Sequence, residues 1–321
     1  MAKVILIALG GNAIKQSNEK GSSEEQFKNC WKTTKHISEI IKNLDQEDRL
    51  IITHGNGPQV GNLMVQQKLA QDIVPAHPMD VVGAMTQGQI GYMLQQTLIN
   101  HLKKMDLDVP VCAIINQVLV DKNDPEFFGE KASKPVGNFL TAEEAKEMKE
   151  NNPQYIIKQV KPNGERCWRR TVPSPDPISN LEAEVIKKLV DAGVIVIASG
   201  GGGIPVLEEE GNYQGIEAVI DKDLAGERLA EIVGADIFLI LTDVGEAKIN
   251  YGKANEKGLS RITFKEAKQY FKEGHFLAGS MGPKVKACLR FLENGGKKAI
   301  ITSLDKALEA LKEQSGTIIE K

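Results

Sequence analysis

The sequence lacks paired cysteines, long apolar runs and an N-terminal targeting pattern, and each absence excludes a class of protein. Its four cysteines, Cys30, Cys112, Cys167 and Cys288, are far apart and form no CxxC pair, which argues against a zinc site or a disulfide scaffold. We therefore expect a reduced, cytoplasmic setting. No apolar run approaches the roughly 18 residues of a membrane span. Residues 1–12 lack the cationic start and the long apolar stretch of a signal peptide.

A strong charge of either sign is also missing. The 321 residues carry a formal net charge of -3, so no bulk attraction to nucleic acid or to an anionic membrane is indicated. Hydrophobic residues make up 41% and charged residues 26% of the chain, which is ordinary for a soluble globular protein with a sizeable core. The length suits one large α/β domain or two smaller ones.

Several common catalytic and nucleotide-binding motifs are absent as well. There is no GxxxxGKS or GxxxxGKT P-loop, and the glycines of residues 55–61 have the wrong spacing for a dinucleotide fingerprint. HExxH and GxSxG do not occur, so a zinc protease and a serine hydrolase have no support. The histidines are scattered, and we interpret His54 as a hydrogen-bonded turn residue and not as a general base.

The sequence does contain a pattern that occurs four times, in which a short apolar strand runs directly into a polar, mostly glycine-rich turn. The strands span 4–9, 50–53, 194–198 and 237–241, and the turns begin at Gly10, His54, Ser199 and Thr242. Glycine lets backbone N–H groups approach a ligand closely, and oriented N–H groups suit anions. Several such turns at one end of a sheet predict a phosphate site at the carboxyl ends of the strands.

Strands alternate with helical patterns, which favours βα units and a mainly parallel sheet. Helices are expected at about 24–44 and 79–104, and two further buried strands at 109–120 and 298–303. Ser179-x-x-Glu182 and Thr263-x-x-Glu266 resemble capping boxes that begin later helices.

Residues 122–175 differ from the rest because they are polar and rich in proline. Thr141-x-x-Glu144 predicts a short helix within this segment. The segment is an excursion from the sheet, and its residues alone leave two alternatives open. It is either a lid or small subdomain, or a long surface insertion.

Two lysines are placed at the predicted N-termini of helices. Lys222 lies between Asp221 and Asp223, and Lys284 follows Pro283, which suits the first helical position. A cation at this positive end of the helix dipole is unfavourable by under about 1 kcal/mol. An anion bound between the lysine and the helix end would remove the conflict. The alternative is a solvated lysine that tolerates the cost.

Asp221 and Asp223 have two compatible roles. They can cap the helix and supply a favourable acid in its first turn, and they can orient Lys222 and its neighbours. Lys134 lies in a Ser-Lys-Pro-Val-Gly loop, whose proline and glycine fix the backbone and present the side chain, although most loop lysines are only solvated. Converging lysines and glycine turns suit phosphoryl transfer, whose transition state spreads negative charge over oxygens.

At these motifs the chain resembles the carbamate kinase family, which has the amino-acid-kinase fold. The matching motifs occur in order at 8–13, 54–61, 84–88, 134–137, 172–175, 200–205, 218–223 and 279–284. Gly-Gly-Asn and Asp-Lys-Asp are common to the wider superfamily, whereas Gly-Asn-Gly-Pro-Gln and Lys-Pro-Val-Gly are typical of carbamate kinases.

The resemblance implies an open three-layer α/β/α sandwich with a mainly parallel central sheet and a small protruding subdomain. It implies one amino-acid-kinase domain over 1–321, with an acceptor lobe at 1–215 that includes the subdomain at 122–175, and a nucleotide lobe at 216–321. The implied reaction is ATP + carbamate ⇌ ADP + carbamoyl phosphate with Mg²⁺, catalysed by a homodimer. Fermenting organisms commonly run it toward ATP in arginine deiminase catabolism.

The resemblance also assigns roles to residues. Lys134 matches the lysine that reaches from the subdomain toward carbamoyl phosphate, and Lys222 and Lys284 match the pair that grips the transferring phosphoryl group. Asp221 or Asp223 matches the aspartate that organises those lysines. The phosphate cradle corresponds to Gly10, Gly11, Asn12, Gly55, Asn56, Gly57, Gly201 and Gly202. The adenosine site corresponds to Thr242, Asp243, Val244, Asn250, Tyr251, Ser280 and Met281. No side chain is an obvious direct Mg²⁺ ligand, so phosphates and water are expected to hold the ion.

One stretch departs from the family pattern. Family members often carry Gly-Arg-Gly just before Trp-Arg, but this chain has Gly164-Glu165-Arg166-Cys167 at that place. The missing glycines are expected where the subdomain rejoins the main fold, so the departure bears on lid motion and on carbamate affinity.

Two other functions are compatible with the residues. One is a kinase of another carboxylate or of a nucleoside monophosphate on the same fold, which would lack the Lys134 loop. The other is a non-catalytic nucleotide sensor, in which Lys222 and Lys284 would affect only affinity. The presence of all three lysines argues against the sensor.

Overall fold

The computed structural model describes residues 2–16, 18–277 and 279–321. Its centre is a sheet of eight strands in the order β15-β17-β16-β12-β1-β2-β9-β3. Neighbouring strands are parallel except for β16 and β17. The strands span Val4–Leu9 (β1), Arg49–His54 (β2), Val111–Ala113 (β3), Ile195–Ile197 (β9), Ile237–Thr242 (β12), Arg261–Thr263 (β15), Lys298–Ser303 (β16) and Thr317–Glu320 (β17).

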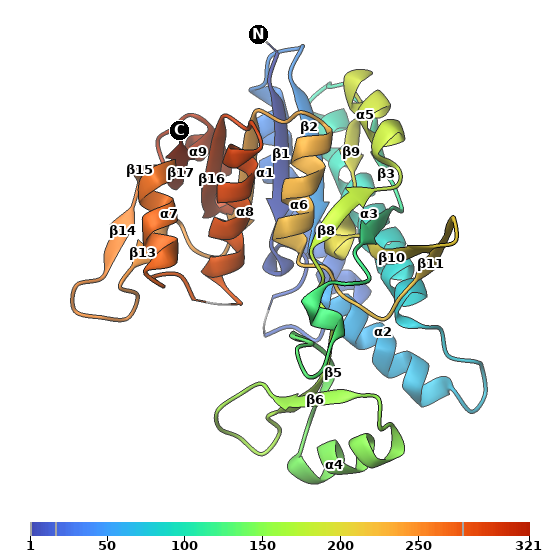
Figure 1. Ribbon diagram of the computed structural model, residues 1–321. Coiled ribbons are helices and arrows are strands. Elements are labelled where there is room, and N and C mark those ends of the chain that lie inside the picture. The colour runs from blue at the N-terminus through green and yellow to red at the C-terminus, as the bar shows by residue number, and fades with distance from the viewer. Residues whose placement is uncertain (1, 17, 278) are drawn as a thin grey trace.

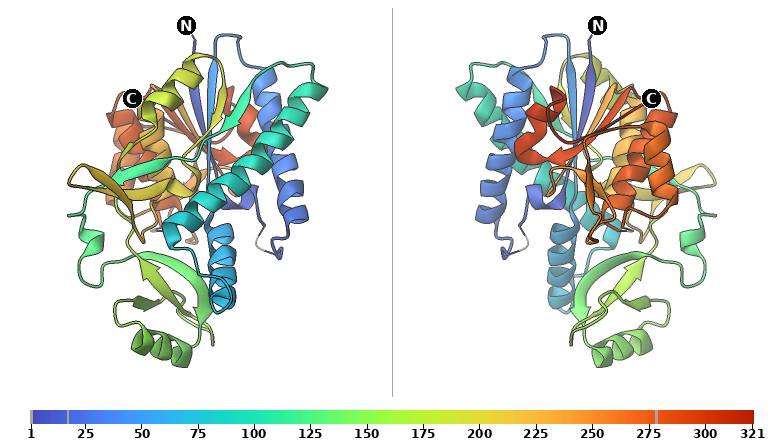
Figure 2. Two further views of the ribbon diagram at one scale, coloured as in Figure 1. Left: turned by 90° about the vertical axis from the view of Figure 1, so that its right-hand side faces the viewer. Right: turned by 90° about the vertical axis from the view of Figure 1, so that its left-hand side faces the viewer.

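Helices cover both faces of this sheet, and Figure 2 shows it edge-on between the two layers. One face packs against α1 (Ser23–Lys42), α3 (Met79–Lys104) and α9 (Ala307–Leu311), and the other against α5 (Ala183–Asp191), α6 (Lys222–Ile232), α7 (Phe264–Lys272) and α8 (Met281–Glu293). Side chains of a strand alternate between faces. In β1, Leu6 and Ala8 therefore enter one core, while Ile5, Ile7 and Leu9 enter the other. The predicted α/β/α sandwich is confirmed.

Two smaller sheets extend the main one. A four-stranded sheet contains β4 (Gln117–Val120), β8 (Pro177–Asn180), β10 (Ile204–Glu209) and β11 (Asn212–Gly215), and a hairpin contains β13 (Ala247–Ile249) and β14 (Lys257–Leu259). Short 3₁₀ turns span Gly11–Ala13 (η1), Pro125–Phe127 (η2), Gly200–Gly202 (η3) and Leu304–Lys306 (η4). None of the helices within the described ranges combines the length and the apolar character that a membrane-spanning segment requires.

The proline-rich excursion folds as a small protruding subdomain. It contains β5 (Lys134–Leu140), α4 (Ala142–Asn151), β6 (Ile156–Gln159) and β7 (Trp168–Val172), and its sheet has the order β5-β7-β6. In Figure 1 it projects below the main body, beside α2 (Gly57–Ala70). Val136 and Val172 pack against Met64 of α2 and Met79 of α3. These apolar contacts hold the subdomain to the body.

Among the described residues, capping boxes begin α1, α4 and α7, and one of the predicted boxes is wrong. Thr141 with Glu144 and Thr263 with Glu266 form complete boxes at α4 and α7. Ser179, in contrast, lies in β8, and α5 begins only at Ala183. The Glu182 carboxylate instead accepts a hydrogen bond of 2.8 Å from the backbone N–H of Gln117. It therefore holds the start of β4.

Three other sequence predictions need correction. Residues 109–120 do not form one strand, because β3 and β4 belong to different sheets. Helix α8 begins at Met281, so Pro283 is its third residue. The stretch at 164–167 joins β6 to β7 inside the subdomain, so the missing glycines do not lie where the subdomain rejoins the main fold.

Candidate active site

The four polar turns of the sequence lie at one edge of the sheet. The strands that precede them, β12, β1, β2 and β9, are consecutive and parallel, so their carboxyl ends meet. The backbone N–H of Gly10 donates to the carbonyl of Leu241 at 2.9 Å, and that of Gly55 donates to the carbonyl of Leu9 at 3.1 Å. The Asn12 amide contacts the Asp243 carboxylate at 3.4 Å. The turns therefore lie together at the sheet edge where the sequence predicts a cradle for phosphate oxygens.

The three candidate lysines and two candidate aspartates form one ionic cluster beside this cradle. Asp223 accepts from Lys222 Nζ at 2.6 Å and from Lys284 Nζ at 3.0 Å. Asp221 accepts from Lys134 Nζ at 2.9 Å through Oδ2 and from the backbone N–H of Asp223 at 2.9 Å through Oδ1. Asp221 is thus both the N-cap of α6 and a partner of the subdomain's lysine. Residues from β5, α6 and α8 converge here.

The cluster has one formal positive charge in excess, since three lysines face two aspartates. The Asp223 side chain is 4% exposed. Burial alone would raise its pKa, but Lys222 and Lys284 outweigh burial and lower the pKa to about 2. Asp223 therefore stays ionised and is the counter-charge for both lysines at the positive ends of α6 and α8. An anion with several oxygens would balance the remaining charge.

Two glycines of the cradle are required by the fold itself. Gly201 and Gly202 have φ values of 68° and 99°, which side-chain-bearing residues rarely adopt. A Cβ on Gly201 would lie 2.0 Å from the Asn56 amide nitrogen, and one on Gly202 would lie 2.5 Å from the carbonyl oxygen of Ile220. Gly201 thus lets the turn after β9 pack closely against the turn after β2, and Gly202 lets it pack against the segment that precedes α6.

Gly11 and Gly57 have no such requirement. Neither has a positive φ, and a Cβ built on either would meet no protein atom within 4 Å. Gly57 is exposed and Gly11 is half-buried, so both can be reached by a ligand. We therefore infer that ligand access, and not folding, favours glycine at these positions.

Replacing Gly11 by alanine tests this inference. The melting temperature of Gly11→Ala should stay the same or rise slightly, because the fold tolerates a methyl group and alanine reduces the entropy of the unfolded chain. The kcat/KM for phosphoryl transfer should fall at least about 10-fold, since the methyl group separates the phosphate from the backbone N–H groups. Gly88, which is exposed in α3 with open space around it, provides the control variant Gly88→Ala. A Gly11→Ala enzyme with unchanged kinetics would contradict the inference.

Comparison with known proteins identifies the family. Residues 3–303 match the family model described as "Amino acid kinase family". A carbamate kinase of Thermococcus kodakarensis is 56% identical over 317 residues, which cover 98% of both chains. One of Pyrococcus furiosus is 53% identical over 319 residues, covering 99% of each.

The chain belongs to the carbamate kinase family. A solved structure of a carbamate kinase from Giardia lamblia, bound to AMP-PNP, superimposes with a TM-score of 0.93 at 43% identity. The match covers 100% of this chain and 99% of that one. Carbamate kinases are phosphotransferases, so the family agrees with a cradle for phosphate oxygens.

The candidate nucleotide residues of this carbamate kinase fall into three groups. Thr242 is the last residue of β12, Asp243 and Val244 follow it, and Asp243 contacts Asn12 of the cradle. Ser280 and Met281 begin α8, one turn before Lys284. Asn250 and Tyr251 lie in the β13–β14 loop, where the Asn250 amide donates to the carbonyl of Asn255. The contacts thus connect the first group to the cradle, while Asn250 bonds within its own loop.

His54 is a buried, hydrogen-bonded residue, as the sequence indicated, but it is the last residue of β2 and not part of a turn. Its Nδ1 lies 3.0 Å from the carbonyl oxygen of Gly55. Burial lowers its pKa to about 4, and Lys222 contributes in the same direction. A Cβ on Gly200 would lie 2.5 Å from its ring. The imidazole is therefore neutral and packed beneath the turns of the carbamate kinase cradle.

The structure contains a buried polar network that supports the glycine turns and that was not predicted from the sequence. Ser199, which has a positive φ of 52°, donates its N–H to the Asn116 carboxamide at 2.7 Å, and its hydroxyl accepts from Asn180 at 2.7 Å. Gln87 donates to the carbonyls of Asn116 and Gly200 at 3.2 and 3.1 Å. Polar residues inside otherwise apolar segments were the only signal for this network.

Proposed function

We propose that the protein catalyses reversible phosphoryl transfer between ATP and carbamate, with ADP and carbamoyl phosphate as products. One observation carries the proposal: Asp223 joins Lys222 to Lys284 while Lys134 reaches the same cluster from the subdomain. Family membership supports carbamate as the acceptor, since relatives at 56% and 53% identity are carbamate kinases.

Each lysine has a role in this proposal. A carbamate oxygen attacks the γ-phosphorus of ATP, and the bond from that phosphorus to the bridging oxygen of ADP breaks. Lys222 and Lys284 stabilise the charge on the transferring phosphoryl group and on the leaving ADP oxygen. Lys134 binds the carbamoyl end. Carbamate is already an anion at neutral pH, so the reaction requires no general base. A neutral, buried His54 agrees with this.

Mg²⁺ enters, in this proposal, as part of the nucleotide substrate. Both oxygens of Asp223 accept from lysines, and both oxygens of Asp221 accept hydrogen bonds. Within the described residues no group of three or more histidine, cysteine, aspartate or glutamate side chains is arranged to hold a metal. We propose that phosphate oxygens and water supply the ligands of the ion, which would neutralise phosphate charge when bound.

The remaining proposals rest on the family resemblance. We infer a cytoplasmic homodimer that forms ATP from carbamoyl phosphate at the end of arginine deiminase catabolism. The cysteines of the chain are free thiols, which supports a reducing location. The lobes at 1–215 and 216–321 are proposed as the acceptor and nucleotide sides. A sedimentation mass equal to one chain would overturn the dimer.

An acceptor panel tests the proposed function. ADP formation from ATP and Mg²⁺ is measured with carbamate, acetate and a nucleoside monophosphate as alternative acceptors. We expect turnover with carbamate to exceed that with the other two by several orders of magnitude. Preference for acetate or the monophosphate would favour the rival kinase, and ADP binding without turnover would favour a sensor.

A further inference from the structure

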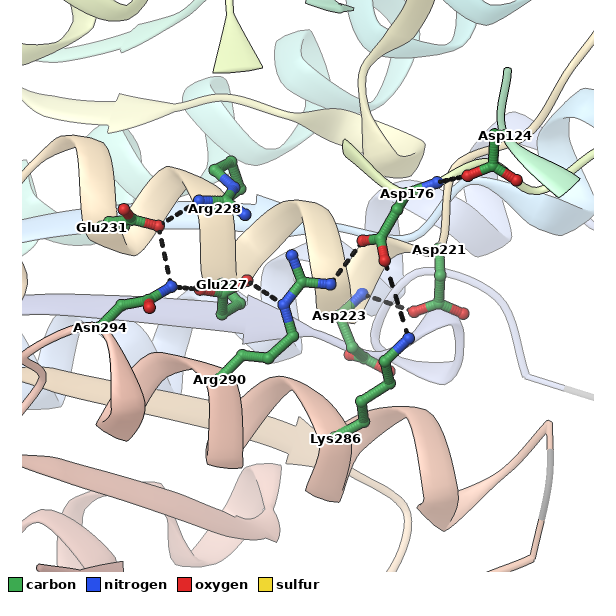
Figure 3. A network of polar contacts seen from close by, with 10 residues as sticks. All are labelled: Asp124, Asp176, Asp221, Asp223, Glu227, Arg228, Glu231, Lys286, Arg290 and Asn294. Atoms are coloured by element: carbon green, nitrogen blue, oxygen red, sulfur yellow. Dashed lines mark hydrogen bonds and ion pairs between the residues drawn. The ribbon is translucent and has the colours of Figure 1, made fainter. Parts of the chain in front are cut away.

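A second ionic network lies next to the lysine cluster and joins three parts of the molecule (Figure 3). Arg290 of α8 is at its centre. One terminal nitrogen of its guanidinium donates to the Asp176 carboxylate at 2.5 Å, and its Nε lies 3.2 Å from Glu227 Oε2 on α6. Asp176 belongs to the segment between β7 and β8, where the chain returns from the subdomain. One side chain therefore contacts α6 and the root of the subdomain from α8.

Burial of the Glu227 carboxylate at this position is energetically unfavourable. Its side chain is 0% exposed, and burial raises its pKa although Arg290 and Arg228 act in the opposite direction. Its Oε2 makes an ion pair with Arg290 but no hydrogen bond of good geometry. Apolar residues of similar volume usually stabilise such a site as well as a buried ion pair does. A role other than stability therefore accounts better for this pair.

The Glu227–Arg290 pair lies on the same two helices as Asp223 and Lys284 of the lysine cluster. Glu227 follows Asp223 by four positions on α6, which places both on one side of the helix, about one turn apart. Arg290 follows Lys284 by six positions on α8. Because helices are rigid over this length, a link between Glu227 and Arg290 sets the separation of the two helix N-termini. That separation determines how Lys222 and Lys284 face a phosphoryl group.

Carboxylates also bind the two chain segments at the root of the subdomain to each other. Glu126 Oε2 accepts from the backbone N–H of Ser133 at 2.9 Å and from that of Ser174 at 3.1 Å. Asp124 Oδ2 accepts from the backbone N–H of Asp176 at 2.9 Å. Ser133 immediately precedes Lys134. The Asp176–Arg290 bond therefore attaches the strand pair that carries Lys134 to α8.

We propose that Arg290 is a positioning residue for phosphoryl transfer. It touches no reacting group, but it holds α6, α8 and the root of the subdomain at the spacing at which the three lysines converge. Glu227 and Asp176 are its two anchors. The proposal rests on the proposed function, because it concerns the geometry of that reaction.

Arg290→Met, alone and combined with Glu227→Gln, tests the link between the helices. The single variant should lower kcat about 10- to 100-fold, because small displacements of positioned groups are costly, and should also lower the melting temperature. The double variant leaves no buried charge unpaired, since Asp176 is 48% exposed and keeps Lys286 at 3.8 Å, and it should recover the melting temperature, while kcat stays low. Arg290→Lys, which keeps the charge, should recover part of kcat. If kcat recovers together with melting temperature in the double variant, the role is only structural and the proposal is overturned.

Asp176→Asn tests the attachment of the subdomain. It should raise the KM for carbamoyl phosphate several-fold and leave the KM for ADP unchanged, since it loosens the segment that carries Lys134. If neither KM changes, the proposed role of Asp176 in attaching the subdomain is overturned. Lys268→Met is the control, because the 2.6 Å ion pair of Lys268 with Glu293 is exposed on both sides, at 45% and 44%, and it should leave kcat unchanged. An inactive wild type would contradict the proposed function, whereas an active wild type with unaffected Arg290 variants would contradict only this inference.

Discussion

Lys222→Ala and Lys284→Ala are each expected to lower kcat by about 10²-fold or more, the scale of removing one preorganised charge stabiliser. Both ammonium groups are fixed by Asp223 at 2.6 and 3.0 Å, so they need no rearrangement when charge develops on the phosphoryl group. The bound reactants and the transition state have the same total charge. In the transition state, however, negative charge is spread over the equatorial oxygens of the transferring phosphoryl group. Each lysine should therefore act mainly on kcat.

Steady-state kinetics of the two variants, in both reaction directions, measure this effect. Lys187 provides a matched control, because it pairs with Asp191 at 3.3 Å on the surface of α5. Lys187→Ala should leave kcat and KM unchanged. If Lys222→Ala or Lys284→Ala raises the KM for the nucleotide but keeps the wild-type kcat, the lysine binds the substrate and the transition state equally well. That result would remove these lysines from the catalytic step.

Asp223→Asn is expected to damage both activity and stability. The substitution leaves Lys222 and Lys284 as two partly buried cations without a counter-charge at the positive ends of α6 and α8. Removing one partner of a buried ion pair costs roughly 3–5 kcal/mol, which corresponds to a fall in melting temperature of roughly 4–8 °C for a chain of this size. The kcat should fall at least about 10²-fold, because neither lysine keeps its position.

Thermal unfolding and kinetics at a temperature well below the transition separate the two effects. Asp191→Asn removes a carboxylate that is 60% exposed, and it should change neither melting temperature nor kcat. If Asp223→Asn unfolds like the wild type and keeps its kcat, Asp223 does not organise the lysines and the account of the cluster is wrong.

The architecture of the site follows from local sequence signals. The sequence places a turn at Gly10, His54, Ser199 and Thr242, at the end of a buried apolar strand in each case, although His54 and Thr242 are the last residues of β2 and β12. Parallel pairing brings all four strand ends to one edge. The charge of Lys222 and Lys284 at helix N-termini was a conflict visible in the sequence, and the structure resolves part of it through Asp223. A local contradiction between charge and helix dipole was thus an informative signal.

Contacts between distant segments could not be predicted in the same way. Residues 109–120 resemble one strand by their apolar content, but Asn116 bonds to Ser199 and Gln87 and the chain changes sheets there. The Arg290–Glu227 pair joins positions 63 residues apart whose side chains have ordinary sequence contexts. In contrast, the capping box of Ser22 and Glu25 at α1 was visible as Ser-x-x-Glu and was missed.

The most direct test of the account is ATP formation from carbamoyl phosphate, ADP and Mg²⁺, read through coupled hexokinase, with Lys134→Ala beside the wild type. Lys134 Nζ reaches Asp221 from the subdomain, and the account assigns it to the carbamoyl end of the substrate. We expect rapid turnover by the wild type and a loss of about 10²-fold or more in kcat/KM for carbamoyl phosphate in the variant. Wild-type protein that binds ADP without forming ATP, or an equally active Lys134→Ala enzyme, would contradict it.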